Sequence, residues 1–244
     1  MAFLTGESLE RISSAAPGLQ LVTYWQGCSE TTGEDARTLL SQMVSGLISR
    51  GWIHPLEKTL ENAVDGLGLS EERIKNAADE LQKVGLMQVA DGKIVSLAGM
   101  FSTTPTKICY FMDEDLKVYL LGALAALAVP QALGRPGELM ADCGQAGSAK
   151  RLKLDCDEEG VHTRVPDTIC IFLPDWSGED HPADAIAGGG LFADDEALAA
   201  WQEANDEPEG MPLASMMFPM AAGELGGQLG KTMESLLDRF ANFG

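Results

Sequence analysis

Five cysteines are the residues of this sequence best suited to nucleophilic or soft-metal chemistry. They are Cys28, Cys109, Cys143, Cys156 and Cys170. An odd number of cysteines without a CxxC pair is typical of reduced thiols rather than of a disulfide framework. Cys156 and Cys170 alternate with apolar residues at strand spacing, which predicts core positions for both. Cys143 is a candidate nucleophile or metal ligand, and the alternative is a small buried side chain.

His181 lies within a polar, glycine-rich segment, 174–190, which predicts a long loop. Asp184 follows it by three residues. Because a histidine beside a carboxylate can transfer protons or bind a metal, His181 and Asp184 are candidate catalytic residues. The alternative is a solvated acidic loop that contains one histidine.

A cluster of methionines near two prolines offers thioethers, which are soft ligands for Cu(I). These methionines are Met211, Met216, Met217 and Met220. A candidate soft-metal site combines the last three of them with Cys143. The alternative is an amphipathic stretch in which the methionines fill the core.

The first half of the chain contains the signals of helices followed by a hairpin. Apolar residues recur at helical spacing before Gly51, Ser70 is placed to cap a helix, and Asp91–Gly92 predicts a tight turn. The expected helices are 37–51, 56–65 and 70–84, and the expected strands are 87–90 and 93–97. This order predicts a winged-helix-like domain over 37–101, preceded by an N-terminal extension over 1–36.

The second half predicts an α+β core domain over 102–244. We expect a strand at 107–112, a helix at 116–129 that Pro130 ends, three strands of one antiparallel sheet at 152–156, 161–165 and 168–173, and helices at 194–204 and 223–240. The fold class predicted is therefore α+β, with a helical domain followed by a mixed or antiparallel sheet core.

Charge argues against nucleic acid and anionic membranes as partners. The chain has 17 Lys and Arg against 37 Asp and Glu, a net charge of −20. The expected helix 70–84 is itself rich in acids, so it suits packing or dimerisation better than DNA reading, and a homodimer is left open. Residues 1–10 lack a basic signal-peptide region, and the apolar run 118–129 is too short for a bilayer span. We therefore expect a cytoplasmic protein.

Several segments of the second half are similar to the alkylmercury lyases. They are 115–135, the strand and turn 143–147, the strand end 172–174, and 191–193 leading into the helix with Trp201. Their order and spacing match that family over about 37–240. The resemblance implies a winged-helix-like region followed by a mixed sheet core.

The same resemblance assigns the functional positions. These lyases cleave a carbon–mercury bond with two cysteines and an aspartate, one cysteine preceding the aspartate by three residues on a helix. Matching Tyr119 and Pro130 to that helix places Gly122 at the cysteine and Ala125 at the aspartate. The second cysteine falls within 186–190, which contains no cysteine. Cys143 corresponds to a cysteine with a structural role in the family.

We therefore expect no ordinary organomercurial cleavage, because soft thiolates and a proton carrier are missing from the expected site. Glycine in place of the cysteine and alanine in place of the aspartate predict an enlarged apolar pocket for another small-molecule substrate or ligand, lined by Gly122, Ala125, Ile186 and Ala187. Whether the chain catalyses an altered reaction is left open, and so is the identity of any cofactor. One alternative is a soft-metal binder, since a copper-delivery lipoprotein is similar in fold. Another is an acidic module that binds protein.

Overall fold

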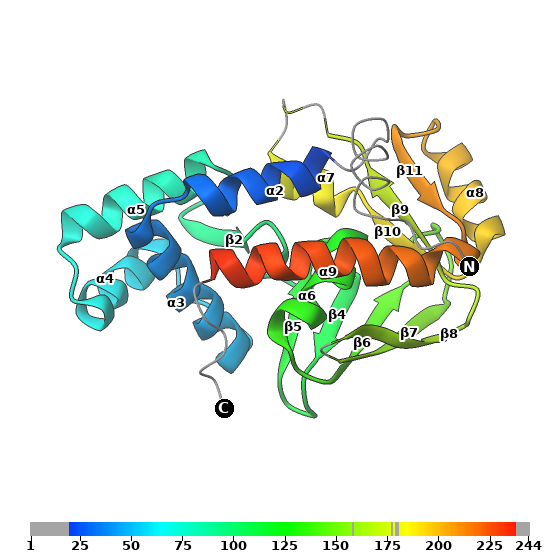
Figure 1. The fold of residues 1–244 in the computed structure, drawn as a ribbon, viewed down its shortest axis with the longest axis horizontal. Coiled ribbons are helices and arrows are strands. Elements are labelled where there is room, and N and C mark those ends of the chain that lie inside the picture. The colour runs from blue at the N-terminus through cyan, green and yellow to red at the C-terminus, as the bar shows by residue number, and fades with distance from the viewer. Residues whose placement is uncertain (1–19, 158, 177, 179–180, 238–244) are drawn as a thin grey trace.

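The computed structural model describes residues 20–157, 159–176, 178 and 181–237. It is an α+β fold in which helices pack on and beside two antiparallel sheets (Figure 1). The larger sheet has eight strands in the order β1-β2-β3-β5-β4-β6-β7-β8, and the smaller has three in the order β10-β9-β11. The large side chains of the core, among them Trp25, Tyr110 and Phe172, are fully buried.

Helices precede the hairpin in the N-terminal part. They are α2 (Gln20–Thr31), α3 (Glu34–Arg50), α4 (Leu56–Leu67) and α5 (Glu71–Lys83). Local signals set their ends: Gly51 adopts a left-handed conformation after α3, and the Ser70 hydroxyl accepts a hydrogen bond from the Arg73 N–H at the start of α5. The hairpin strands are β1 (Met87–Ala90) and β2 (Lys93–Leu97), as the sequence predicts.

The hairpin continues directly into the larger sheet. Its further strands are β3 (Phe101–Ser102), β4 (Ile108–Phe111), β5 (Lys117–Leu120), β6 (Gly137–Asp142), β7 (Arg151–Asp157) and β8 (Gly160–Val165). β2 pairs with β3, and β3 pairs with β5. The predicted domain boundary at 101–102 thus falls inside β3, within one continuous sheet.

The smaller sheet is built around β9 (Cys170–Pro174), all five residues of which are buried. β10 (Gly190–Phe192) and β11 (Gly210–Leu213) pair with it on either side. The expectation that 168–173 joins the sheet of β7 and β8 is wrong. Strand pairing depends on contacts between distant segments, and here β9 finds its partners after residue 189 instead of before residue 166.

Two long apolar helices pack against each other in the middle of the molecule (Figure 1). They are α6 (Ala123–Leu133) and α9 (Phe218–Leu236). Glycines of α9 allow this close approach, because a Cβ atom added at Gly226 would lie 2.6 Å from the Leu127 carbonyl oxygen. Helix α2, from the predicted N-terminal extension, also contacts α9, and its Trp25 is fully buried.

The predicted helix 116–129 is wrong in its first part. Residues Lys117–Leu120 form β5, with Val118 and Leu120 buried, and the helix begins only after Gly122. The acidic residues that precede β5 form a turn, in which the Asp113 carboxylate accepts hydrogen bonds from the N–H groups of residues 115 and 116. Pro130 does not end the helix, because packing against α9 carries it on to Leu133.

The expected loop 174–190 contains the short helix α7 (Pro182–Ala187). Helix α8 (Asp195–Ala204) follows β10 close to its expected limits, while α9 begins earlier than expected, at Phe218. A 3-10 turn, η1 (Ser215–Met217), precedes α9. None of the helices described combines the length and apolar character of a membrane span.

Candidate functional site

The fold brings together the two positions that the resemblance assigns to the catalytic cysteines. Gly122 caps the N-terminus of α6 with an extended backbone, at φ −170° and ψ −169°. A Cβ atom built on Gly122 would lie 2.0 Å from the Ile186 carbonyl oxygen and 3.2 Å from that of Gly189. Segments more than sixty residues apart therefore meet at the start of α6. We call Gly122, Ala125 and Ile186 the closed corner.

A side chain at position 122 would have no room in the closed corner. Ala125 and Ile186 are both fully buried, and the α7 backbone occupies the volume that any side chain at position 122 would need. The expectation that Gly122 opens an apolar pocket is thus wrong at this residue. Glycine serves here to permit a close approach of backbone to backbone.

An open cleft of about 420 Å³ lies immediately beside this corner. Its lining includes the segment 187–190 at the end of α7, Trp201 of α8 and the ends of β4 and β6. Side chains lining it include Thr106, Lys107, Ile108, Leu121, Asp142, Ala187, Leu191, Phe192 and Trp201. Of the expected pocket residues, Ala187 is exposed and lines this cleft.

Trp201 gives the cleft an aromatic wall. Its ring centroid lies 4.9 Å from that of Phe172 and 5.1 Å from that of Phe192. Both phenylalanines belong to the smaller sheet and are buried, and the half-buried indole packs against them. The position of Trp201 therefore depends on how α8 is attached to that sheet.

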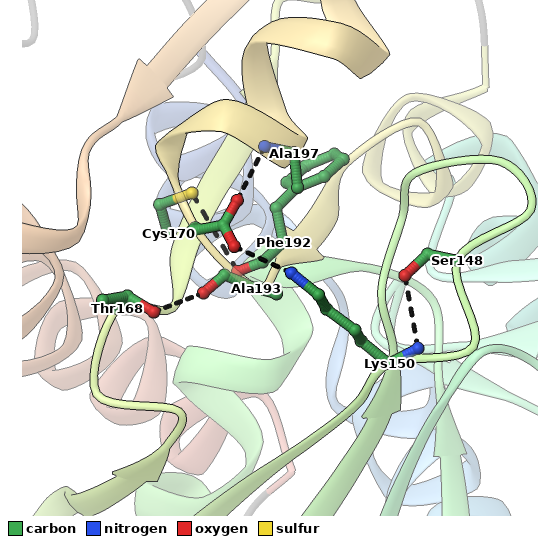
Figure 2. Close-up of polar contacts among 8 residues, drawn as sticks. Ser148, Lys150, Thr168, Cys170, Phe192, Ala193 and Ala197 are labelled. Atoms are coloured by element: carbon green, nitrogen blue, oxygen red, sulfur yellow. Dashed lines mark hydrogen bonds and ion pairs between the residues drawn. The ribbon is translucent and has the colours of Figure 1, made fainter.

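Asp194 secures the start of α8, and Figure 2 shows Lys150 and Ala197, whose ammonium and backbone N–H are its partners. Its carboxylate accepts a hydrogen bond of 2.8 Å from the Ala197 N–H and forms an ion pair of 3.0 Å with the Lys150 ammonium. The Ala197 N–H and then Lys150 lower the pKa of Asp194, because both favour its charged form. Close by, the Thr168 hydroxyl donates to the Ala193 carbonyl oxygen at 2.7 Å.

One cation and one anion stand at the cleft. Lys107 and Asp142 are adjacent across β4 and β6, where the Asp142 N–H donates to the Lys107 carbonyl oxygen at 2.9 Å. The Asp142 carboxylate is exposed and lies 3.8 Å from the Arg151 guanidinium. The cleft therefore combines apolar walls with a charged edge, as small-molecule sites commonly do.

His181 and Asp184 make separate structural contacts. The His181 Nδ1 atom accepts a hydrogen bond of 3.2 Å from the Ala183 N–H and so caps α7. Its Nε2 atom is buried, and burial lowers the pKa of the ring. The Asp184 carboxylate accepts from the Gln88 amide at 3.1 Å and ties α7 to β1. Neither residue lines the cleft described above.

All five cysteines are buried. Burial raises the pKa of the Cys28 and Cys109 thiols, and it raises that of Cys156 to about 12. The Cys170 thiol also has a pKa of about 12, raised by burial and then by the Asp195 carboxylate. Cys143 is 3% exposed and directly precedes Gly144 of the cleft wall. These thiols are therefore poorly placed to act as nucleophiles or metal ligands.

The methionine set combines sulfurs in different surroundings. Met216 is 82% exposed and Met217 36% exposed on the 3-10 turn, Met220 is half-buried, and Cys143 lies in the core. Within the residues that the structure describes, no cluster of three or more His, Cys, Asp or Glu could hold a metal ion.

Sequence reasoning missed Trp201, Lys107 and Asp142 as cleft residues. Trp201 does lie within the helix expected at 194–204. Lys107 and Asp142 lie at the ends of the neighbouring strands β4 and β6. Because β6 is not among the predicted elements, nothing in the sequence indicated that these two residues lie close together.

Comparison with known proteins shows which fold this chain resembles. No protein-family model matches the sequence, and no curated protein matches it. Solved structures do match its fold. One of them is the crystal structure of the mercury-bound form of MerB2, with a TM-score of 0.69 and 15% sequence identity. The match covers 87% of this chain and 98% of that one, so the chain has a MerB-like fold.

Proposed function

We propose that this protein binds a small organic molecule in the open cleft between 187–190 and Trp201, and that it does not cleave carbon–mercury bonds. The observation that carries the proposal is the contrast at the start of α6. There the corner expected to hold catalytic thiolates is filled by backbone, while a cleft of about 420 Å³ opens next to it. The resemblance places the lyase site at this same end of α6.

The thiols of the chain support the second half of the proposal. Protonolysis of a carbon–mercury bond by a lyase of this kind requires thiolates that can hold the metal. The closed corner has no cysteine, and the five thiols of the chain are buried, four of them with a raised pKa. In this protein the fold therefore serves a ligand other than an organomercurial.

The lining of the cleft indicates the kind of ligand. The indole of Trp201 offers a flat apolar surface, and Leu121 and Ala187 add aliphatic ones. Lys107 and Asp142 place one charge of each sign at the edge. A molecule with a planar apolar body and one polar group fits this arrangement. The cleft volume of about 420 Å³ lies in the usual range of small-molecule sites.

The test uses benzoate, benzyl alcohol and benzylamine, which share a ring and differ in charge. Ligand-observed NMR with the full chain measures their binding. Ala187→Phe adds bulk at an exposed residue of the cleft wall, and Ala204→Phe adds the same bulk at an exposed residue on the last turn of α8. We expect at least one ligand to bind the parent and Ala204→Phe alike, and to bind Ala187→Phe roughly tenfold or more weakly.

Two results would overturn the proposal. One is the absence of binding by all three molecules and by a wider set of planar compounds of similar size. The other is binding that is equal in the parent and in Ala187→Phe, which would place the ligand elsewhere. Release of benzene from a phenylmercury salt above a thiol-buffer control would contradict the second half.

A further inference from the structure

A second hollow, of about 690 Å³, lies between α4 and α5. We call it the α4–α5 groove. Helix α4 contributes Leu56, Leu60 and Val64, which recur every fourth residue on one face and are only half-buried. Helix α5 contributes Ile74 and Ala78, which are buried. The groove therefore has an apolar floor that is partly open to solvent.

Acidic side chains surround this floor. The lining includes Glu57, Glu61, Asp65, Glu71 and Asp79. Two lysines, Lys58 and Lys75, also line it, and the Lys58 ammonium is already paired with the Glu61 carboxylate at 3.0 Å. The charge at the rim is thus strongly negative, in a chain whose total is −20.

This charge decides what can occupy the groove. A duplex nucleic acid would bring phosphates against the acids of α5, which is repulsive. A second copy of the chain would bring another −20, and its acidic surfaces would repel those of the first. A partner rich in lysine or arginine would instead gain from the field.

We propose that the α4–α5 groove is a docking surface for an amphipathic, basic helix of another protein. Apolar side chains at positions i, i+4 and i+8 of that helix would cover Leu56, Leu60 and Val64, and flanking cations would face the acidic rim. From residue 56 to residue 64 the floor of α4 extends about 12 Å at 1.5 Å per residue, so two to three helical turns of the partner make contact.

The groove is independent of the ligand cleft. Figure 1 places α4 and α5 at the opposite end of the molecule from α8, which carries Trp201. Changes to the groove therefore leave small-molecule binding unaltered, and failure of either proposal leaves the other in place.

The test measures fluorescence anisotropy of a labelled helical peptide with leucines at i, i+4 and i+8 and lysines on both flanks, titrated with the full chain. Asp65→Lys/Asp79→Lys reverses two charges at the rim, and both residues are exposed. Glu203→Lys/Glu234→Lys makes the same change in net charge at exposed helical residues outside the groove. A third variant, Leu60→Gln/Val64→Thr, makes the floor polar, and circular dichroism confirms that it is folded.

We expect the rim variant to weaken binding roughly tenfold and the matched control to weaken it less than about twofold. The floor variant weakens binding to a similar degree as the rim variant, and a peptide with glutamate in place of lysine does not bind. Equal losses in the rim variant and its control would show attraction to net charge alone and overturn the proposal. Unchanged affinity in a folded floor variant would overturn it as well.

Discussion

Ile186 and Ala187 are neighbours at the end of α7, yet they face two different environments. Ile186 is fully buried, and its carbonyl oxygen fills the space beside Gly122. Ala187 is exposed and lines an open cleft. The difference teaches that small side chains at a position do not by themselves produce a cavity there. At Gly122 the backbone of Ile186 fills the space, and the accessible volume lies beside it at Ala187.

Thiol reactivity gives the largest expected effect. A pKa of about 12 instead of 9.0 leaves Cys156 and Cys170 with about a thousandfold less thiolate at neutral pH, and burial also blocks access. We expect Ellman's reagent to label the native protein very slowly and all five thiols rapidly in guanidinium chloride. Fast labelling of one native thiol would mean that the folded protein contains an accessible thiolate and would contradict the burial of all five.

Gly122→Ala should destabilise the fold by about 1–3 kcal/mol or more, since the added methyl group would overlap the Ile186 carbonyl oxygen. Chemical denaturation measures this change in the free energy of unfolding. Gly223→Ala is the matched control, because it adds a methyl group to an exposed position in α9 with nothing within 4 Å. The control should gain about 0.5–1 kcal/mol. A Gly122→Ala protein as stable as the parent would mean that the corner is open.

Asp194→Ala should cost about 1 kcal/mol by removing the cap of α8, the helix that carries Trp201. Asp194→Asn keeps an acceptor for the Ala197 N–H and loses mainly the solvent-exposed pair with Lys150, so it should cost only a few tenths of a kcal/mol. Because folding lowers the pKa of Asp194, its charge stabilises the protein above the unfolded pKa of about 3.9, and that stabilisation is lost as the pH falls. Urea denaturation at several pH values measures both effects, and equal losses in the two variants would contradict the capping role.

His181 should show the smallest effect. Burial favours its neutral form, so its pKa in the folded protein lies below 6.5. The stability linked to this ring is present above the unfolded pKa and is lost as the pH falls. Asp184 opposes the shift, and we expect Asp184→Asn to lower the pKa further. An NMR titration of the ring protons checks both statements, and a pKa above 6.5 would instead favour an acid–base role for His181.

Local signals made part of the fold predictable. Ser70, Gly51 and the Asp91–Gly92 turn mark the ends of α5, α3 and β1, and those elements lie close to where the sequence places them. The limits of β5 could not be predicted, because the apolar run through it continues into α6 without a polar residue to separate strand from helix. The partners of β9 depend on segments beyond residue 189, which no local pattern specifies.

The sequence could indicate that Gly122 lies near the segment 186–190, but it could not indicate whether a space lies between them. Matching Tyr119 and Pro130 to the lyase helix brings Gly122 and the 186–190 segment to one position, and the structure joins them there. Whether they touch or enclose a space is decided by ångström-scale packing of α7 against α6, which residue types do not encode. The cleft also needs β6 beside β4, a pairing the sequence did not signal.

The most direct test of the account follows the backbone amides of the two regions in one titration. Two-dimensional ¹H–¹⁵N NMR of the labelled full chain is recorded as benzoate, benzyl alcohol or benzylamine is added. The account predicts that the amides of 188–190 and the indole N–H of Trp201 shift with a common saturation curve, while those of Gly122 and Ala125 change little. Shifts that are largest at Gly122 and Ala125 would place the ligand in the corner and contradict the account.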